Sequence, residues 1–126
     1  MSDLSELLRA VSPAIWMQNE RLSSAMFKPS RADGGKLSVY DGAAISVREA
    51  IEHRRIQGRP CLGMAVVTAE ECSLADPRLI CVKSPVPDNP AHAHIDFTAL
   101  TTRKAVENAA AGFRDFAAAR GMKTTQ

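Results

Sequence analysis

The order of apolar and polar residues in the first third of the chain predicts one helix followed by two strands. Leucines and a valine recur at helical intervals over residues 3–13, and Asp3 and Glu6 have the spacing of a capping box. An apolar segment over 22–27 and another over 37–40 have the length of short strands. We therefore expect the chain to begin with a helix and to continue with two strands.

The middle of the chain predicts two helices on either side of a buried strand. The segments 46–57 and 68–71 each open with Ser or Thr followed three residues later by Glu, which is the capping-box pattern. Between them, residues 61–67 form a continuous apolar run. Such a run favours a central strand buried on both faces over an edge strand.

The last third of the chain predicts two strands and the longest helix. An apolar segment over 79–82 is separated by the proline-rich connection 84–90 from an alternating segment over 91–97. A threonine at 101–102 then caps a helix with one apolar stripe, which ends at Gly121.

Together these elements predict a single α+β domain over residues 1–126, with a sheet of about five strands covered by helices. We expect a mixed sheet. The strands before Gly42 can pair as an antiparallel hairpin, whereas the helix over 46–57 allows a parallel crossover.

The alternating segment 91–97 carries the strongest candidate for chemistry. Its period of two places His92, His94 and Asp96 on one face of a strand and three apolar residues on the other. The plain structural interpretation is a half-buried strand that turns its polar face to water. Alternatively, His92 or His94 acts as an acid or base, because histidine titrates near neutral pH.

A metal site is a third interpretation of the same residues. Imidazoles two residues apart on a strand face can reach one ion, so His92 and His94 are its candidate ligands. Asp96 lies roughly 13 Å along the strand from His92 and suits an outer-shell role better. The missing ligands would have to come from His53, Asp41, Asp88 or a cysteine.

Length and composition indicate an ordinary globular protein. The chain has 126 residues, of which 45% are hydrophobic, enough for a core without structural disulfides or metals. Its three cysteines are an odd number without paired spacing, which favours free thiols in a reducing compartment. The N-terminus is acidic, and no apolar run approaches the roughly 18 residues of a membrane span. We expect a cytoplasmic protein that does not bind membranes.

Positive charge is concentrated in one part of the chain. The net charge is only +2, but residues 21–59 carry eight Lys and Arg against four acids. This excess favours an acidic partner surface, although a solvated face with Arg–Glu pairs explains it as well. It is weaker than the charge of a dedicated nucleic-acid binder. The candidate partner-binding residues are Arg21, Arg31, Arg48 and Arg55.

Cysteine catalysis and the common cofactor motifs are not expected. Cys61 and Cys81 lie in apolar runs, where a cysteine behaves as a small hydrophobic residue. Cys72 follows two glutamates, which raise rather than lower a thiol pKa. The sequence lacks GxSxG, HExxH, CxxC and GxGxxG elements, so no cofactor is predicted.

Four short segments within residues 16–97 resemble a group of small bacterial proteins of uncharacterised function. The resemblance implies a bacterial origin and a single α+β domain, and it supplies no catalytic residue or cofactor. The segments are Met26-Phe27-Lys28-Pro29-Ser30, Leu37-Ser38-Val39-Tyr40-Asp41-Gly42, Val66-Val67-Thr68-Ala69-Glu70-Glu71-Cys72 and His92-Ala93-His94-Ile95-Asp96-Phe97.

The function predicted from these observations is a small cytoplasmic interaction or accessory module that binds a protein partner through its basic face and its proline-containing loops. One alternative is a hydrolase or nucleotide-processing enzyme that uses His92 and His94, with or without a metal. Another is a nucleic-acid accessory protein. Self-association into a homo-oligomer is compatible with each of these functions.

Overall fold

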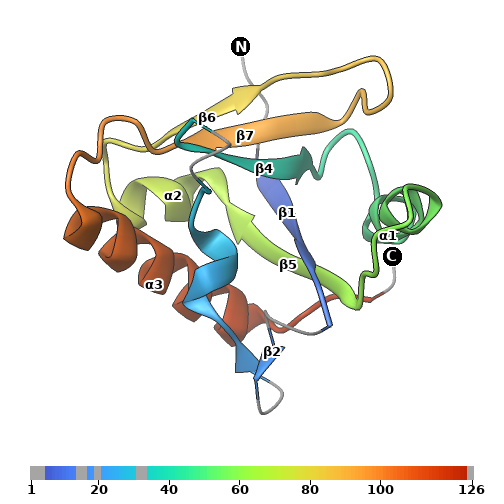
Figure 1. Ribbon diagram of the computed structural model, residues 1–126, viewed down its shortest axis with the longest axis horizontal. Coiled ribbons are helices and arrows are strands. Elements are labelled where there is room, and N and C mark those ends of the chain that lie inside the picture. The colour runs from blue at the N-terminus through green and yellow to red at the C-terminus, as the bar shows by residue number, and fades with distance from the viewer. Residues whose placement is uncertain (1–4, 14–16, 19–20, 31–33, 125–126) are drawn as a thin grey trace.

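The computed structural model describes residues 5–13, 17–18, 21–30 and 34–124, and this part of the chain is organised around one five-stranded sheet (Figure 1). The order of its strands is β5-β1-β4-β7-β6, and β2 and β3 form a separate two-stranded ribbon. The strands are β1 (Glu6–Val11), β2 (Met17–Gln18), β3 (Arg21–Leu22), β4 (Lys36–Asp41), β5 (Gly63–Thr68), β6 (Ile80–Lys83) and β7 (His92–Asp96). The helices are the 3-10 helix η1 (Ser24–Phe27), α1 (Val47–Ile56), α2 (Ala69–Ala75) and α3 (Arg103–Arg120).

The α+β class, the sheet of about five strands and the long C-terminal helix are confirmed. The expected mixed sheet is wrong, because every neighbouring pair of strands is antiparallel. Helix α1 does connect two strands that run in the same direction, β4 and β5. Strand β1 lies between them and pairs antiparallel with both, so the crossover produces no parallel ladder.

The helix expected over 3–13 is wrong for residues 6–11, which form a strand, and its expected capping residue Asp3 lies outside the described residues. Residues Glu6–Val11 form β1 in the interior of the sheet, where Leu7 and Val11 enter one core and Leu8 enters the other. These spacings satisfy both a helical and a strand period, and pairing with β4 and β5 decides between them. The expected strand over 22–27 is also wrong, since most of it is η1, which Ser23 caps.

The other expected elements are confirmed, with one change at β5. Both capping boxes form, at Ser46 and at Thr68, and Thr102 caps α3. Strand β5 is buried on both faces as predicted, but it lies at the edge of the sheet and not at its centre. Its outer edge is partly covered, because Met64 exchanges two backbone hydrogen bonds of 2.8 Å with Lys123.

The two faces of the sheet are covered unequally (Figure 1). Helices α2, α3 and η1 pack on one face and form the larger core. Helix α1 packs on the other face but covers only β5, β1 and the end of β4 around Tyr40. The rest of that face, over β4, β7 and β6, has no covering helix among the described residues. We call it the open face. None of the described helices has the length and apolar character needed to cross a membrane.

Candidate functional site

A cavity of about 230 Å³ lies where α1 meets the open face. The β1–β4 ladder ends at the pair Leu8 and Tyr40, and beyond it the carbonyl of Ser38 accepts a hydrogen bond from Arg9 instead of from a β1 backbone group. The cavity opens at this separation, with α1 and the connection before β7 as its other walls. We call it the polar pocket. Its polar lining includes Tyr40, His53, Arg54, Arg59, Asn89 and His92.

A hydrogen-bonded chain fixes His53 at one wall of the polar pocket. His53 Nε2 lies 2.9 Å from the carbonyl oxygen of Asp88, which can only accept, so Nε2 carries the proton and donates. In the neutral imidazole Nδ1 is then an acceptor, and the hydroxyl of Tyr40 donates to it over 2.7 Å. The two rings meet edge to face, with centroids 5.6 Å apart. Helix α1, strand β4 and the connection before β7 are thereby joined.

The guanidinium of Arg54 faces the same hydroxyl. Burial raises the pKa of Tyr40, whereas the charges of Arg54 and Arg59 and a hydrogen bond from Arg54 lower it, and burial has the larger effect. The Nε of Arg54 is buried and has no hydrogen-bond acceptor within the described residues. Among the residues that the structure describes, neither Arg54 nor Arg59 forms an ion pair. The lining of the polar pocket therefore contains three arginines, Arg9, Arg54 and Arg59, against one carboxylate, that of Asp88.

On the open face, His92 and His94 both form hydrogen bonds with Ser84. His92 Nδ1 lies 3.0 Å from the carbonyl oxygen of Ser84, so Nδ1 donates to it and to Ser84 Oγ at 2.8 Å. Ser84 Oγ in turn donates to His94 Nδ1 over 3.0 Å. On the far side of His92, the hydroxyl of Ser38 donates to Nε2 over 3.3 Å. Such a chain can pass a proton between imidazoles through a hydroxyl, and His92 connects it to the polar pocket.

The predicted alternation of 91–97 is confirmed, since Ala93, Ile95 and Phe97 are buried and the three polar residues are half-buried on the open face. Burial lowers the pKa of His94, and the nearby charge of Lys36 lowers it further. Its imidazole is therefore mainly neutral at pH 7.

Asp96 does not join the two histidines. Its Oδ1 accepts hydrogen bonds from the backbone N–H of Thr98 at 2.8 Å and from the Thr98 hydroxyl at 2.6 Å. These bonds hold the pKa of Asp96 below its usual range. Asp96 thus stabilises the turn that follows β7.

The structure does not gather the residues that were considered as metal ligands. The described residues contain no group of three or more His, Cys, Asp or Glu side chains arranged to hold an ion. His53 is committed to Tyr40 and Asp88, and Asp41 accepts from the backbone of Ala43 and lies 3.9 Å from the amine of Lys83.

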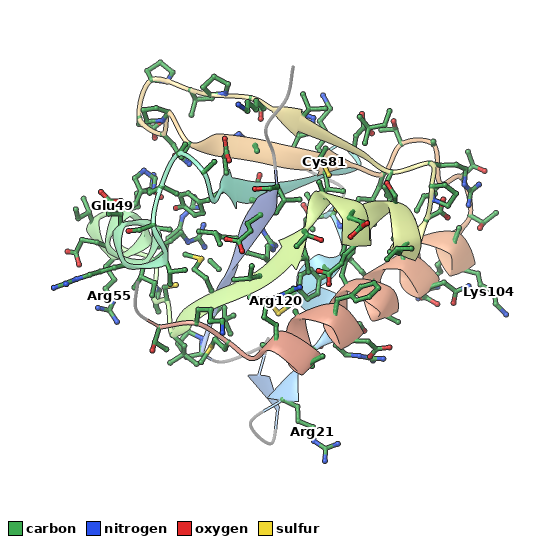
Figure 2. The ribbon with its side chains drawn as sticks, turned by 180° about the vertical axis from the view of Figure 1, so that it is seen from behind. Arg21, Glu49, Arg55, Cys81, Lys104 and Arg120 are labelled. Atoms are coloured by element: carbon green, nitrogen blue, oxygen red, sulfur yellow. The ribbon has the colours of Figure 1, made fainter. Side chains whose placement is uncertain are left out.

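Of the four arginines predicted to bind a partner, the three that the structure describes lie in two separate places. Arg48 and Arg55 lie on α1 and line a second hollow with Glu52. Arg21 lies on β3, and Figure 2 shows it at a different end of the molecule from Arg55. Arg31 lies outside the described residues. The polar pocket is lined by three other arginines, Arg9, Arg54 and Arg59.

Comparisons of the chain with models of protein families, with curated proteins and with solved structures found no match.

Proposed function

We propose that this protein is a binding module that takes up one anionic group, a carboxylate or a phosphate, in the polar pocket. The observation that carries the proposal is the buried Nε of Arg54, which lacks an acceptor among the described residues. A buried polar donor left unsatisfied costs about 1–3 kcal/mol, and more when it belongs to a charged group. An oxyanion in the polar pocket that draws the Arg54 side chain toward it would relieve that cost and form a charge-assisted hydrogen bond.

The charge and size of the polar pocket support a single anionic group. Arg9, Arg54 and Arg59 supply positive charge to the lining, against the single carboxylate of Asp88. The volume of about 230 Å³ is below the roughly 300–1,000 Å³ of pockets that enclose whole drug-sized ligands. The pocket therefore suits a terminal group more than an entire nucleotide.

The rim of the polar pocket supports the protein partner predicted from the sequence. Val86, Asp88 and Asn89, from the proline-containing connection before β7, contribute to the lining, and Val86 is exposed. A partner that places an acidic side chain or its C-terminal carboxylate in the pocket would contact this rim. A phosphate group on a small molecule presents the same oxyanion chemistry to Arg54.

Calorimetric titration with sodium acetate and, separately, with inorganic phosphate tests the proposal. We expect saturable binding of at least one anion. Arg54→Gln should weaken it by about 10- to 100-fold, which corresponds to a charge-assisted hydrogen bond of 1.5–3 kcal/mol. The matched control is Arg55→Gln, which removes the neighbouring exposed charge from the same helix and should leave the affinity within about twofold.

The anion that binds more tightly distinguishes a carboxylate on a protein partner from a phosphorylated ligand. A preference for acetate favours a carboxylate on a partner, whereas a preference for phosphate favours a phosphorylated ligand. The proposal is wrong if wild-type protein binds neither anion, or if the two variants lose affinity equally.

A further inference from the structure

Two of the three cysteines meet inside the larger core, although nothing in their spacing along the chain predicts it. Cys72 lies on α2 and Cys81 on β6, and their sulfur atoms are 3.3 Å apart. Helix α2 and strand β6 pack together, and Figure 2 shows Cys81 where the strand passes beside α2. Both cysteines are free thiols.

The environments of the two thiols differ in a way that assigns them different roles. Cys72 is buried, with 1% of its surface exposed, whereas Cys81 is only partly buried. A hydrogen bond from Cys72 stabilises the thiolate of Cys81 and lowers the pKa of Cys81, against the opposing effect of burial. The same contact, together with burial, raises the pKa of Cys72. Cys81 is therefore the thiol that ionises first and that reagents reach first.

We propose that Cys72 and Cys81 form a reversible oxidation site that closes to an intramolecular disulfide on reaction with a hydroperoxide. The sulfurs have to approach by about 1.3 Å to reach the bond length of roughly 2.05 Å. The site is independent of the polar pocket, because Cys81 points to the face of the sheet opposite the open face.

The reaction takes place in two steps and consumes one peroxide. The thiolate sulfur of Cys81 attacks one peroxide oxygen, the O–O bond breaks, and the leaving hydroxide takes a proton to form water. Cys81 is then a sulfenic acid. The sulfur of Cys72 attacks the sulfenic sulfur, the S–S bond forms, the S–O bond breaks, and the departing oxygen leaves as a second water. Two thiols are oxidised by two electrons in total, and hydrogen peroxide is reduced to two waters.

Cys61 provides an internal control. It is buried in the smaller core, which packs against α1, and its thiol lies 3.3 Å from the carbonyl oxygen of Gly63. No other cysteine belongs to that core in the described residues. Cys61 should therefore stay reduced while the pair reacts.

The test is treatment of the reduced full chain with hydrogen peroxide, followed by thiol counting in denaturant and peptide mass mapping. We expect the thiol count to fall from three to one, a mass loss of two hydrogen atoms, a Cys72–Cys81 crosslinked peptide, and full recovery with dithiothreitol. Cys61→Ser should still form the same crosslink. Cys72→Ser should instead accumulate a sulfenic acid at Cys81 that dimedone traps.

Several results would overturn the proposal. They are loss of all three thiols at similar rates, crosslinking between chains, direct oxidation of Cys81 to the sulfinic acid in the wild type, and no reaction at all. Circular dichroism of each variant before treatment establishes that it is folded. Because Cys61→Ser leaves both reacting thiols in place, it tests the assignment even if Cys72→Ser does not fold.

Discussion

Replacing Arg120 with methionine should remove the bidentate ion pair that joins the end of α3 to α2. Arg120 Nη1 donates to the carbonyl oxygen of Val66 over 2.8 Å, and Nη1 and Nη2 donate to the two carboxylate oxygens of Glu71 over 2.9 Å each. Glu71 is also the capping residue of α2 and accepts from the backbone of Thr68. One guanidinium thus joins α3, α2 and β5 (Figure 2).

The expected cost follows from the exposure of the pair. Side-chain exposure is 30% for Arg120 and 14% for Glu71, so water screens the contact only in part. Exposed ion pairs contribute about 0–1 kcal/mol, and breaking a fully buried pair costs about 3–5 kcal/mol. A bidentate, partly buried pair with a third bond to a carbonyl lies between these limits. We expect Arg120→Met to lower the free energy of unfolding by about 2–3 kcal/mol at pH 7.

The loss should depend on pH in a definite direction. The hydrogen bonds from Arg120 hold the pKa of Glu71 below its ordinary value of 4.5, so the stability from this pair is present above pH 4.5 and disappears as the pH falls through the lowered pKa. As the pH falls below 4.5 and through this lowered pKa, the difference between wild type and Arg120→Met should therefore shrink toward about 1 kcal/mol, the value of the bond to Val66.

Urea denaturation at a series of pH values measures both effects. The control is Arg103→Met, which removes an exposed pair with Glu107 on the same helix and should cost no more than about 0.5 kcal/mol. The reasoning is refuted if the two variants lose similar stability at pH 7, or if the deficit of Arg120→Met grows as the pH falls.

Two spectroscopic titrations test the electrostatics of the site. Tyr40 is the sole tyrosine, so its phenolate absorbance should appear with a midpoint above pH 10.0. Arg54→Gln should raise that midpoint further, because Arg54 lowers the pKa of Tyr40. A midpoint at or below 10.0, or one that Arg54→Gln lowers, contradicts the assigned geometry. In proton NMR, His94 should titrate with a midpoint below pH 6.5. Lys36→Ala should move this midpoint upward, because it removes a positive charge that disfavours the imidazolium. An unchanged or lower midpoint in the variant would show that Lys36 does not act on His94.

Much of the fold could be predicted from local sequence signals. The capping boxes at Ser46 and Thr68 and the threonine cap of α3 are side-chain hydrogen bonds between residues close in sequence, so their spacing is sufficient evidence. The β1 segment could not be assigned in this way. Its leucines fit both periods, and the deciding contacts are the ladders with β4 and β5, which come much later in the chain.

The candidate site was predicted only in part. The alternation of 91–97 correctly placed His92 and His94 on one polar face, because that pattern depends on strand geometry alone. The convergence of Tyr40, His53 and Arg54 needed the packing of α1 against the sheet, for which the sequence carries no signal. The same is true of Cys72 and Cys81, whose contact depends on how α2 lies against β6.

The most direct test of anion binding is the side-chain NMR signal of Arg54 Nε–H, followed while the better-binding anion from the calorimetric comparison is added. Because this donor is buried and has no acceptor among the described residues, we predict a saturable shift of its resonance, with the Nε–H of Arg55 as the unshifted reference on the same helix. An Arg54 signal that stays constant to saturation, or that moves no more than that of Arg55, would contradict the proposed binding of an anion in the polar pocket.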